Sequence, residues 1–215
     1  MMNNELTKFS LWAHVKNNDL ASFDQRPDSI RRKAYLLNEG IRCKSWFPED
    51  VEFTMDDNKG MVLVDSIPNR TFLLIFSEKL KSILEKEAPG EIEFLPIQVL
   101  DHQKNKVESS YYIANVLTVI SCTDHQKSVY EMSALDKAQV HHFEHLVLDK
   151  AKIPNNTKIF RLREKTRLVL VRHDFAKLLV DSGCTGINFM NIEDYGKQYR
   201  PVDRVALARE LLKNR

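Results

Sequence analysis

Glycine is scarce in this sequence, which has six glycines among its 215 residues. Phosphate-binding loops need glycines at fixed spacing, and "SGCTG" at residues 182–186 has neither that spacing nor a following Lys-Ser or Lys-Thr. The nucleophile elbow of α/β-hydrolases and the protein-kinase motifs are also missing. The sequence therefore carries none of the common signatures of a nucleotide-binding enzyme, a hydrolase of that type or a kinase.

Cysteines are few and odd in number, and Cys43, Cys122 and Cys184 lie far apart. A secreted disulfide scaffold normally uses more cysteines in an even count. We therefore expect three free thiols, as in a reducing cytoplasm. A nucleophilic role for any of them needs a histidine base held against the sulfur, which sequence spacing alone does not reveal.

Long apolar runs and a strong net charge are also absent. The longest apolar run, "YYIANVLTVISC", has twelve residues and is interrupted by Asn115 and Thr118, whereas a membrane-spanning helix takes about twenty. The N-terminal "MMNNELTKFSLWAHVKNN" lacks a basic segment followed by an apolar one, so we expect no signal peptide and a cytoplasmic protein. A net charge of +2 argues against global attraction to nucleic acid or membranes, and against a global DNA mimic.

What the sequence does contain is a histidine cluster, with His141 and His145 four residues apart. On a helix this spacing would place both imidazoles on one metal ion, but on a strand they would lie about 13 Å apart. The run from His142 to Leu148 lacks a helical apolar stripe, and a turn cluster at residues 153–156 follows it. We predict a strand with Phe143 on the same face as the two histidines, and neither a metal site nor a cofactor.

Two segments share one pattern, because residues 71–97 align without a gap to residues 166–192. Each segment is typical of a strand, a helix, a tight turn and a second strand; Ser77 can cap the first helix and Pro89-Gly90 can end it. Duplication and a shared binary pattern both explain the likeness. Six positions are identical in the two segments: Thr71/Thr166, Leu73/Leu168, Leu84/Leu179, Ile92/Ile187, Phe94/Phe189 and Ile97/Ile192.

These patterns predict an α+β fold whose mixed or antiparallel sheet is built around the two strand-helix-strand units. Between the units, "IANVLTVIS" (residues 113–121) is expected to form a central strand. "RPVDRVALARELLKNR" (residues 200–215) is expected to form a C-terminal amphipathic helix. No Gly-, Ser- or Pro-rich linker divides the chain, so we expect residues 1–66 to pack on a core of residues 67–215.

One acidic run suggests a binding surface for a basic partner, because complementary charge speeds encounter. If "VEF" is extended, Val51 and Phe53 face inward and Glu52 points out. Neighbouring aromatic residues could serve as the anchors that interfaces favour. The alternative is a solvated loop beside two core aromatics. The candidate partner-binding residues are Trp46, Phe47, Glu49, Asp50, Glu52, Asp56 and Asp57.

Two other functions deserve comparison, although we assign no catalytic residue. "DHQK" occurs at residues 101–104 and again at 124–127. Its Asp-His pairs suggest a small hydrolase, but Asp, Gln and Lys after an apolar run are typical of turns, which is the interpretation we favour. Arg161, Arg163, Lys165 and Arg167 alternate along what we expect to be one strand. Their shared face suggests either a nucleic-acid-binding module or a solvated sheet face.

The order of these elements resembles a family of bacterial polymorphic-toxin immunity proteins, the eleventh of the catalogued immunity families. The likeness covers about residues 70–192 and is carried by "IFSEKLKSIL", "IEFLPIQV", "YYIANVLTVISCTDHQKS", "IFRL" and "LVLVRHDFAKLLVDSGCTGINF". The resemblance implies a cytoplasmic antitoxin that binds and blocks a secreted toxin, often a nuclease. It implies no catalytic residues, and it assigns no toxin-contacting residue.

Overall fold

The computed structural model describes residues 8–199 of the chain. The expected amphipathic helix at residues 200–215 lies outside the described residues. The α+β class is confirmed, because helices and strands alternate irregularly along the chain and the strands form mixed and antiparallel sheets. Within the described residues, no helix combines the length and apolar character needed to cross a membrane.

The larger sheet has five strands in the order β11-β1-β10-β9-β6. The N-terminal strand β1 lies next to the edge strand β11 and is antiparallel to both of its neighbours, β10 and β11. The strands are β1 (Phe9–His14), β6 (Val119–Ile120), β9 (Ile159–Leu162), β10 (Lys165–Arg172) and β11 (Ile187–Asn191).

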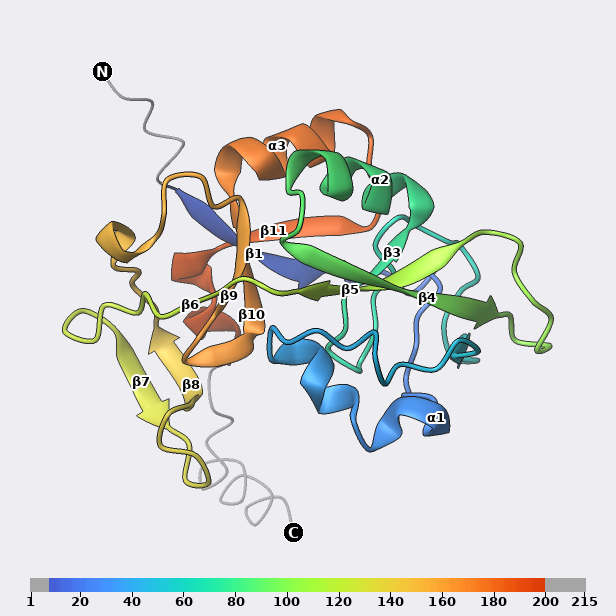
Figure 1. The fold of residues 1–215 in the computed structure, drawn as a ribbon, viewed down its shortest axis with the longest axis horizontal. Helices are drawn as coiled ribbons and strands as arrows, with labels where there is room; N and C mark the ends of the chain where they lie inside the picture. Colours follow the sequence, from blue (N-terminus) through green and yellow to red (C-terminus); the bar gives the residue numbers. More distant parts are fainter. Residues whose placement is uncertain (1–7, 200–215) are drawn as a thin grey trace, which may run out of the picture.

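A second sheet has four strands in the order β2-β4-β5-β3, and its edge strand β2 runs parallel to the end of β4. These strands are β2 (Glu52–Thr54), β3 (Ile75–Ser77), β4 (Ile92–Leu100) and β5 (Tyr111–Val116). A separate hairpin consists of β7 (Val129–Met132) and β8 (Val140–His145). In Figure 1 this hairpin projects from one end of the molecule, whereas the end of β4 lies toward the other.

Two helices lie side by side over the sheets in Figure 1: α2 (Glu78–Glu87) and α3 (His173–Asp181). Helix α2 begins where Ser77 Oγ accepts a hydrogen bond from Leu80 N, as its sequence predicts. It ends before Pro89 and Gly90, whose φ is +77°. The remaining helical segments are short: α1 (Asp28–Arg31), η1 (Ala34–Asn38), η2 (Lys150–Lys152), η3 (Ile192–Asp194) and η4 (Gly196–Tyr199).

The order strand-helix-strand occurs twice, as β3-α2-β4 and as β10-α3-β11. In each case the two strands flank one antiparallel strand, which is β5 in the first unit and β1 in the second. The two units therefore have equivalent topologies, although β5 follows its unit in sequence and β1 precedes its own. A duplication and a shared pattern both predict this arrangement.

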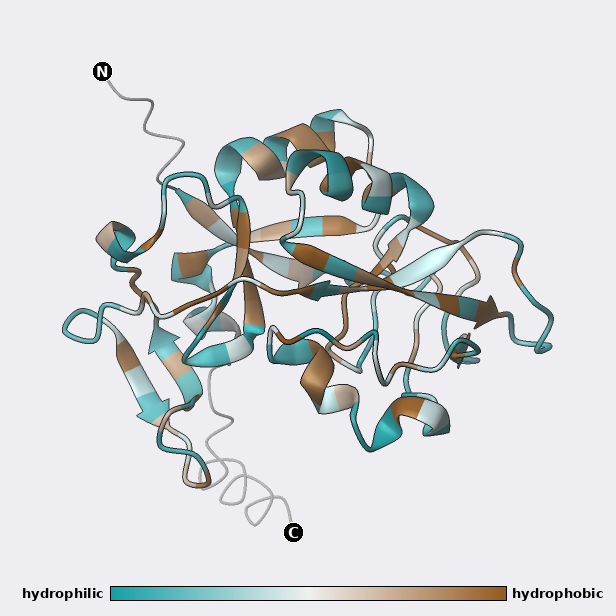
Figure 2. Cartoon of the chain, viewed as in Figure 1, coloured by the Kyte–Doolittle hydropathy of each residue, from teal (hydrophilic) through white to brown (hydrophobic). Residues whose placement is uncertain are grey.

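Three apolar clusters hold these layers together. One joins both helices to both sheets, with Leu80 and Leu84 meeting Phe175 and Leu179. A second packs residues 20–64 against the far side of the four-stranded sheet. The third lies between the five-stranded sheet and the hairpin. Figure 2 shows brown and teal segments alternating along both helices, as expected for elements that bury one face.

Two strand predictions need correction. The expected strand "IANVLTVIS" is two strands, because β5 ends at Val116 and β6 begins at Val119 in the other sheet. The histidine strand is confirmed as β8, but its faces do not alternate as predicted. Two register shifts interrupt the hairpin, so Val140 and Phe143 are both buried while His141 and His145 are exposed.

Candidate functional site

The acidic run lies along β2 at the edge of the four-stranded sheet. Val51 and Phe53 are buried and Glu52 is exposed, as the extended conformation predicts. The side chains of Glu49, Asp50 and Asp57 are exposed, and Asp56 is half-buried. Pairing of β2 with the end of β4 fixes the backbone of Glu52, and the other four acidic residues lie in the segments that flank this strand.

Part of this negative charge is already neutralised. Glu52 lies 3.7 Å from Lys106 Nζ, in an exposed ion pair that contributes little. A hydrogen bond from the Asn58 N–H is the main reason that the pKa of Asp56 is lowered. Asp56 therefore stabilises its own turn, whereas Glu49, Asp50 and Asp57 form no ion pair within residues 8–199.

The two aromatic residues next to the run are partly committed to the core. Trp46 and Phe47 are half-buried and pack against the cluster that holds residues 20–64. Their ring centroids are 6.0 Å apart, and Lys33 Nζ lies 5.5 Å from the Trp46 ring. Both rings are therefore only partly available to a partner.

A buried carboxylate holds the loop that precedes the acidic run. Glu93, on β4, accepts hydrogen bonds from Cys43 N at 2.7 Å and Lys44 N at 3.3 Å. Asn115 Nδ2 also donates to Glu93, at 3.1 Å. Glu93 is 7% exposed. Strand alternation places Glu93 on the opposite face of the sheet from Ile92, and nothing in the sequence indicates that a distant loop covers that face.

The predicted row of basic residues is wrong. Arg161 lies on β9, Arg163 lies in a turn, and Lys165 and Arg167 lie on β10. Arg161 is 1% exposed and donates hydrogen bonds to the backbone carbonyls of Leu37, Val116 and Thr166. These residues form no common face for nucleic acid, because the strand turns back between them.

The Asp-His pairs lie in turns. The Asp101 carboxylate accepts hydrogen bonds from Gln103 N and Asn105 N, and the Asn105 bond is the main cause of the lowered pKa of Asp101. The Lys127 side chain similarly lowers the pKa of Asp124. A carboxylate whose pKa is held low is a weak general base, so the geometry favours the turn interpretation.

A polar hollow of about 460 Å³ lies beside the second Asp-His pair. Asp124, His125 and Lys127 line it together with Asp149 and Lys152. His125 Nδ1 is 2.9 Å from the Tyr130 hydroxyl. Both aspartates also bond to nearby backbone N–H groups. Their carboxylates therefore support the local turns.

The three cysteines are free thiols, and all are buried. Burial, with a contribution from Glu93, raises the pKa of Cys43 to about 11. Burial likewise raises the pKa of Cys122 to about 12. Such thiols are almost fully protonated near neutral pH, and the thiolate is the nucleophilic form. Within the described part of the chain, no three His, Cys, Asp or Glu side chains converge as a metal site would need.

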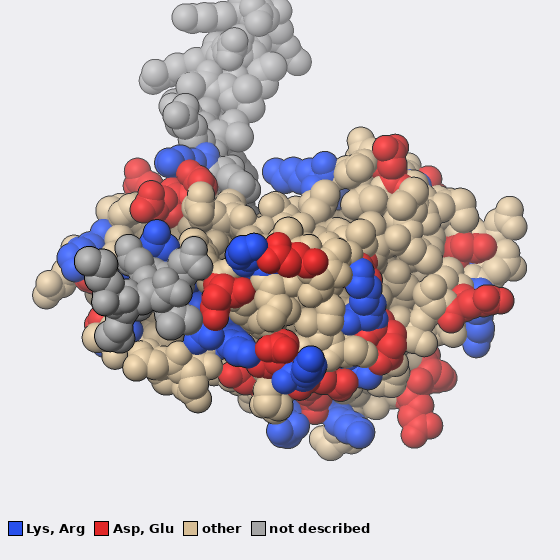
Figure 3. Space-filling view, turned by 90° about the horizontal axis from the view of Figure 1, so that it is seen from above, with Lys and Arg blue, Asp and Glu red and all other residues tan. Residues whose placement is uncertain are grey.

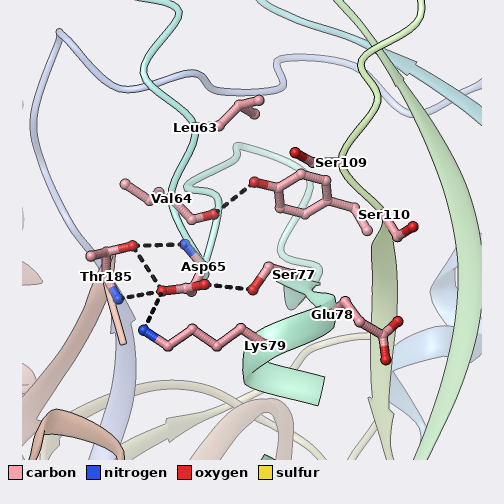
Figure 4. A pocket seen from close by; sticks show the side chains of 10 residues that line it. Leu63, Val64, Asp65, Ser77, Glu78, Lys79, Ser109, Ser110 and Thr185 are labelled. Atoms are coloured by element: carbon pink, nitrogen blue, oxygen red, sulfur yellow. Dashed lines mark hydrogen bonds and ion pairs between the residues drawn. The ribbon is translucent and has the colours of Figure 1, made fainter. Parts of the chain in front are cut away.

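A second hollow, of about 380 Å³, lies where the two units meet (Figure 4). Asp65 Oδ1 accepts a hydrogen bond from Ser77 Oγ at 2.6 Å, and Oδ2 accepts one from Thr185 N at 2.8 Å. Burial acts to raise the pKa of Asp65, but bonds from Ser77 and Thr185 outweigh it and lower that pKa. Figure 4 shows Asp65 joined to Ser77, Lys79 and Thr185, so this carboxylate ties the first unit to the second.

The face above the helices carries charge of both signs. Figure 3 views this face and shows Lys and Arg interleaved with Asp and Glu. Ion pairs form within each helix: Lys81 pairs with Glu78 and Glu85 on α2, and Lys177 pairs with Asp181 on α3. Such a surface lacks the single-sign field that binds nucleic acid.

Comparison with known families matches residues 7–194 to the Immunity protein family (Imm11). The match covers nearly all described residues and extends beyond the segment of residues 70–192 that carries the resemblance. The strand β1, the acidic run and the loop held by Glu93 all fall inside it. Comparison with curated proteins finds no match.

Proposed function

Because the chain belongs to the immunity protein family Imm11, we propose that it is an antitoxin that neutralises a cognate secreted bacterial toxin by direct protein–protein binding. The family match carries this proposal. The internal hydrogen bonding of both polar hollows also supports an inhibitor that acts by binding. We place its action in the cytoplasm, where a toxin that has entered the cell would meet it.

A binding inhibitor needs a rigid surface and high affinity. Specific interfaces bury roughly 800 Å² on each partner, and protection from a lethal enzyme calls for nanomolar binding, about −12 kcal/mol. Three apolar clusters and a buried polar network supply the rigidity. Such an inhibitor requires neither a metal nor a cofactor.

The acidic run fits a toxin with a basic surface, and a nuclease has one because it must bind a polyanion. We therefore propose a nuclease as the toxin. Glu49, Asp50 and Asp57 provide exposed, unpaired charge within the described chain. Since Trp46 and Phe47 are half-buried, this surface acts mainly through long-range attraction and so through the association rate.

Co-expression with a candidate toxin encoded beside the gene for this protein tests the antitoxin role. Wild-type protein should restore growth and co-purify with the toxin. His102→Ala and His125→Ala should protect equally well, because neither histidine has a chemical role in this proposal. A hydrolase that used either histidine would instead lose about 100-fold in activity. Absence of both rescue and a co-purifying toxin would reject the antitoxin role.

Charge reversal tests the acidic run. Asp50→Lys with Glu52→Lys should slow association by about tenfold at low salt, and by less near 0.15 M salt where screening is stronger. Glu85→Lys with Asp181→Lys is the matched control, because it makes the same charge change at exposed residues of the helical face. Equal association rates for the two double variants would remove the acidic run from the interface.

A further inference from the structure

The hairpin of β7 and β8 carries an unusual concentration of exposed apolar side chains. Leu135, in its tip, is 99% exposed, and Val129 and Met132 on β7 are 52% and 42% exposed. These three residues lie within seven positions of the chain. Isolated exposed apolar residues are ordinary, but a group on one projecting element marks an interaction site.

The tip that presents Leu135 is held rigid by its own hydrogen bonds. Ser133 Oγ accepts from Leu135 N and Asp136 N, each at 3.3 Å. Asp136 Oδ1 accepts from Ala138 N at 2.8 Å, and Ser133 N donates to Gln139 O at 2.9 Å to close the loop. The exposed leucine is therefore preorganised, which lowers the entropy lost when a partner immobilises it.

Strand β8 and the end of the tip loop that leads into it are fixed to the body of the molecule. Phe143 is fully buried and Val140 is 3% exposed in the cluster beneath the five-stranded sheet. Val140 N donates to Glu164 O at 2.6 Å, and Gln139 Nε2 donates to Arg163 O at 3.0 Å. The two-stranded sheet is thus a rigid projection (Figure 1), although a free hairpin of this size would be marginally stable.

We propose that this hairpin is the apolar anchor by which the protein holds its toxin, with Leu135 inserted into a concave pocket on the toxin. This inference rests on the proposed antitoxin function. The three side chains cover only part of the roughly 800 Å² that a stable interface buries on each partner, so the hairpin is one part of a larger contact. A second copy would present the same convex tip, so a concave partner fits better than self-association.

The charges around the tip indicate which charges the rim of the toxin's pocket should carry. Glu131, Asp136 and Glu144 are exposed and form no ion pair within residues 8–199, and Lys137 is the only lysine or arginine between residues 129 and 145. The hairpin therefore complements an apolar pocket with a basic rim. Apolar anchors surrounded by a polar rim are the usual source of interface affinity.

The test measures binding of each variant to the purified, catalytically inactivated toxin domain that the co-expression experiment identifies. Leu135→Ser should weaken the Kd by about 30-fold, chiefly through faster dissociation. Val180→Ser is the matched control, because Val180 is an apolar residue 55% exposed on α3, and it should change the Kd by less than about threefold. Both variants should keep the wild-type Tm, since each changes only an exposed side chain.

The outcomes separate the two proposals. Wild-type binding that Leu135→Ser leaves unchanged overturns the anchor and leaves the antitoxin function standing. A wild-type protein that neither binds nor protects overturns both. Sedimentation that reveals a dimer dispersed by Leu135→Ser also overturns the anchor, because the tip would then belong to a contact between copies.

Discussion

Replacement of the buried Arg161 by methionine should destabilise the protein by about 3 kcal/mol. The guanidinium donates to carbonyls of three separate elements: Leu37 on η1, Val116 on β5 and Thr166 on β10. Without it, three buried carbonyls lose a donor at about 2 kcal/mol each. Burial also lowers the pKa of Arg161 to about 10, which means that burying the charged guanidinium destabilises the folded state by about 3 kcal/mol. Methionine carries no charge and avoids this penalty. The loss of hydrogen bonds is the larger effect.

Urea unfolding followed by circular dichroism measures this change. Arg161→Lys should also lose about 2 kcal/mol, since a single ammonium cannot reach three carbonyls in diverging directions. Arg163→Met is the control: this residue is exposed in the adjoining turn and its replacement should change stability by less than about 0.5 kcal/mol. If Arg161→Met is as stable as wild type, the buried hydrogen bonds do not join these elements as argued.

Three further predictions concern stability, each measured by urea unfolding. Burial lowers the pKa of His14 to about 4. Below pH 6.5 the unfolded chain binds a proton at this histidine that the folded protein does not, so the free energy of unfolding falls as the pH falls. Between pH 7.5 and pH 5.5, wild type should lose about 1 kcal/mol more stability than His14→Gln, and equal losses would contradict this. Glu93 accepts hydrogen bonds from Cys43, Lys44 and Asn115. Glu93→Gln replaces one acceptor oxygen with an NH₂ group, so a buried donor loses its acceptor and stability should fall by about 2 kcal/mol. The exposed control Glu85→Gln should change stability very little. Gly186→Ala places a Cβ 2.5 Å from Ser66 O at a φ of +70°, whereas the Cβ of Gly90→Ala, at a φ of +77°, meets nothing within 4 Å. The two variants share the backbone strain, so Gly186→Ala should lose about 2 kcal/mol more stability than Gly90→Ala because of the clash. Equal losses would exclude the clash.

Local sequence patterns were sufficient to predict those helices and strands whose limits and buried faces depend on nearby residues. Ser77 and Pro89-Gly90 predicted the start and the end of α2. Val51 and Phe53 similarly predicted the inward face of β2. In each case the determining residues lie within about ten positions of one another, so a period and a cap describe the element completely.

The buried polar groups could not be predicted in this way. Glu93 and Arg161 look like ordinary charged strand residues, and their burial depends on segments 50 and 124 positions distant. No periodicity encodes which loop will cover a strand. The division of "IANVLTVIS" between two sheets is similar, because its break at Leu117 and Thr118 serves the pairing of β6 with the distant β9.

The two proposed contacts constrain the toxin more than either does alone. The acidic run is fixed to the end of β4, and the hairpin projects from the other end of the long axis (Figure 1). A standard patch of roughly 800 Å² per partner is only about 30 Å across, so a toxin that touches both must wrap around the molecule. Kinetics separate the two contributions, because exposed charges act on association and a buried anchor acts on dissociation. Slower association in the charge-reversal variant and faster dissociation in Leu135→Ser, with additive effects on the Kd, would therefore indicate a wrapped complex. An effect confined to one of the two variants would assign the interface to that end.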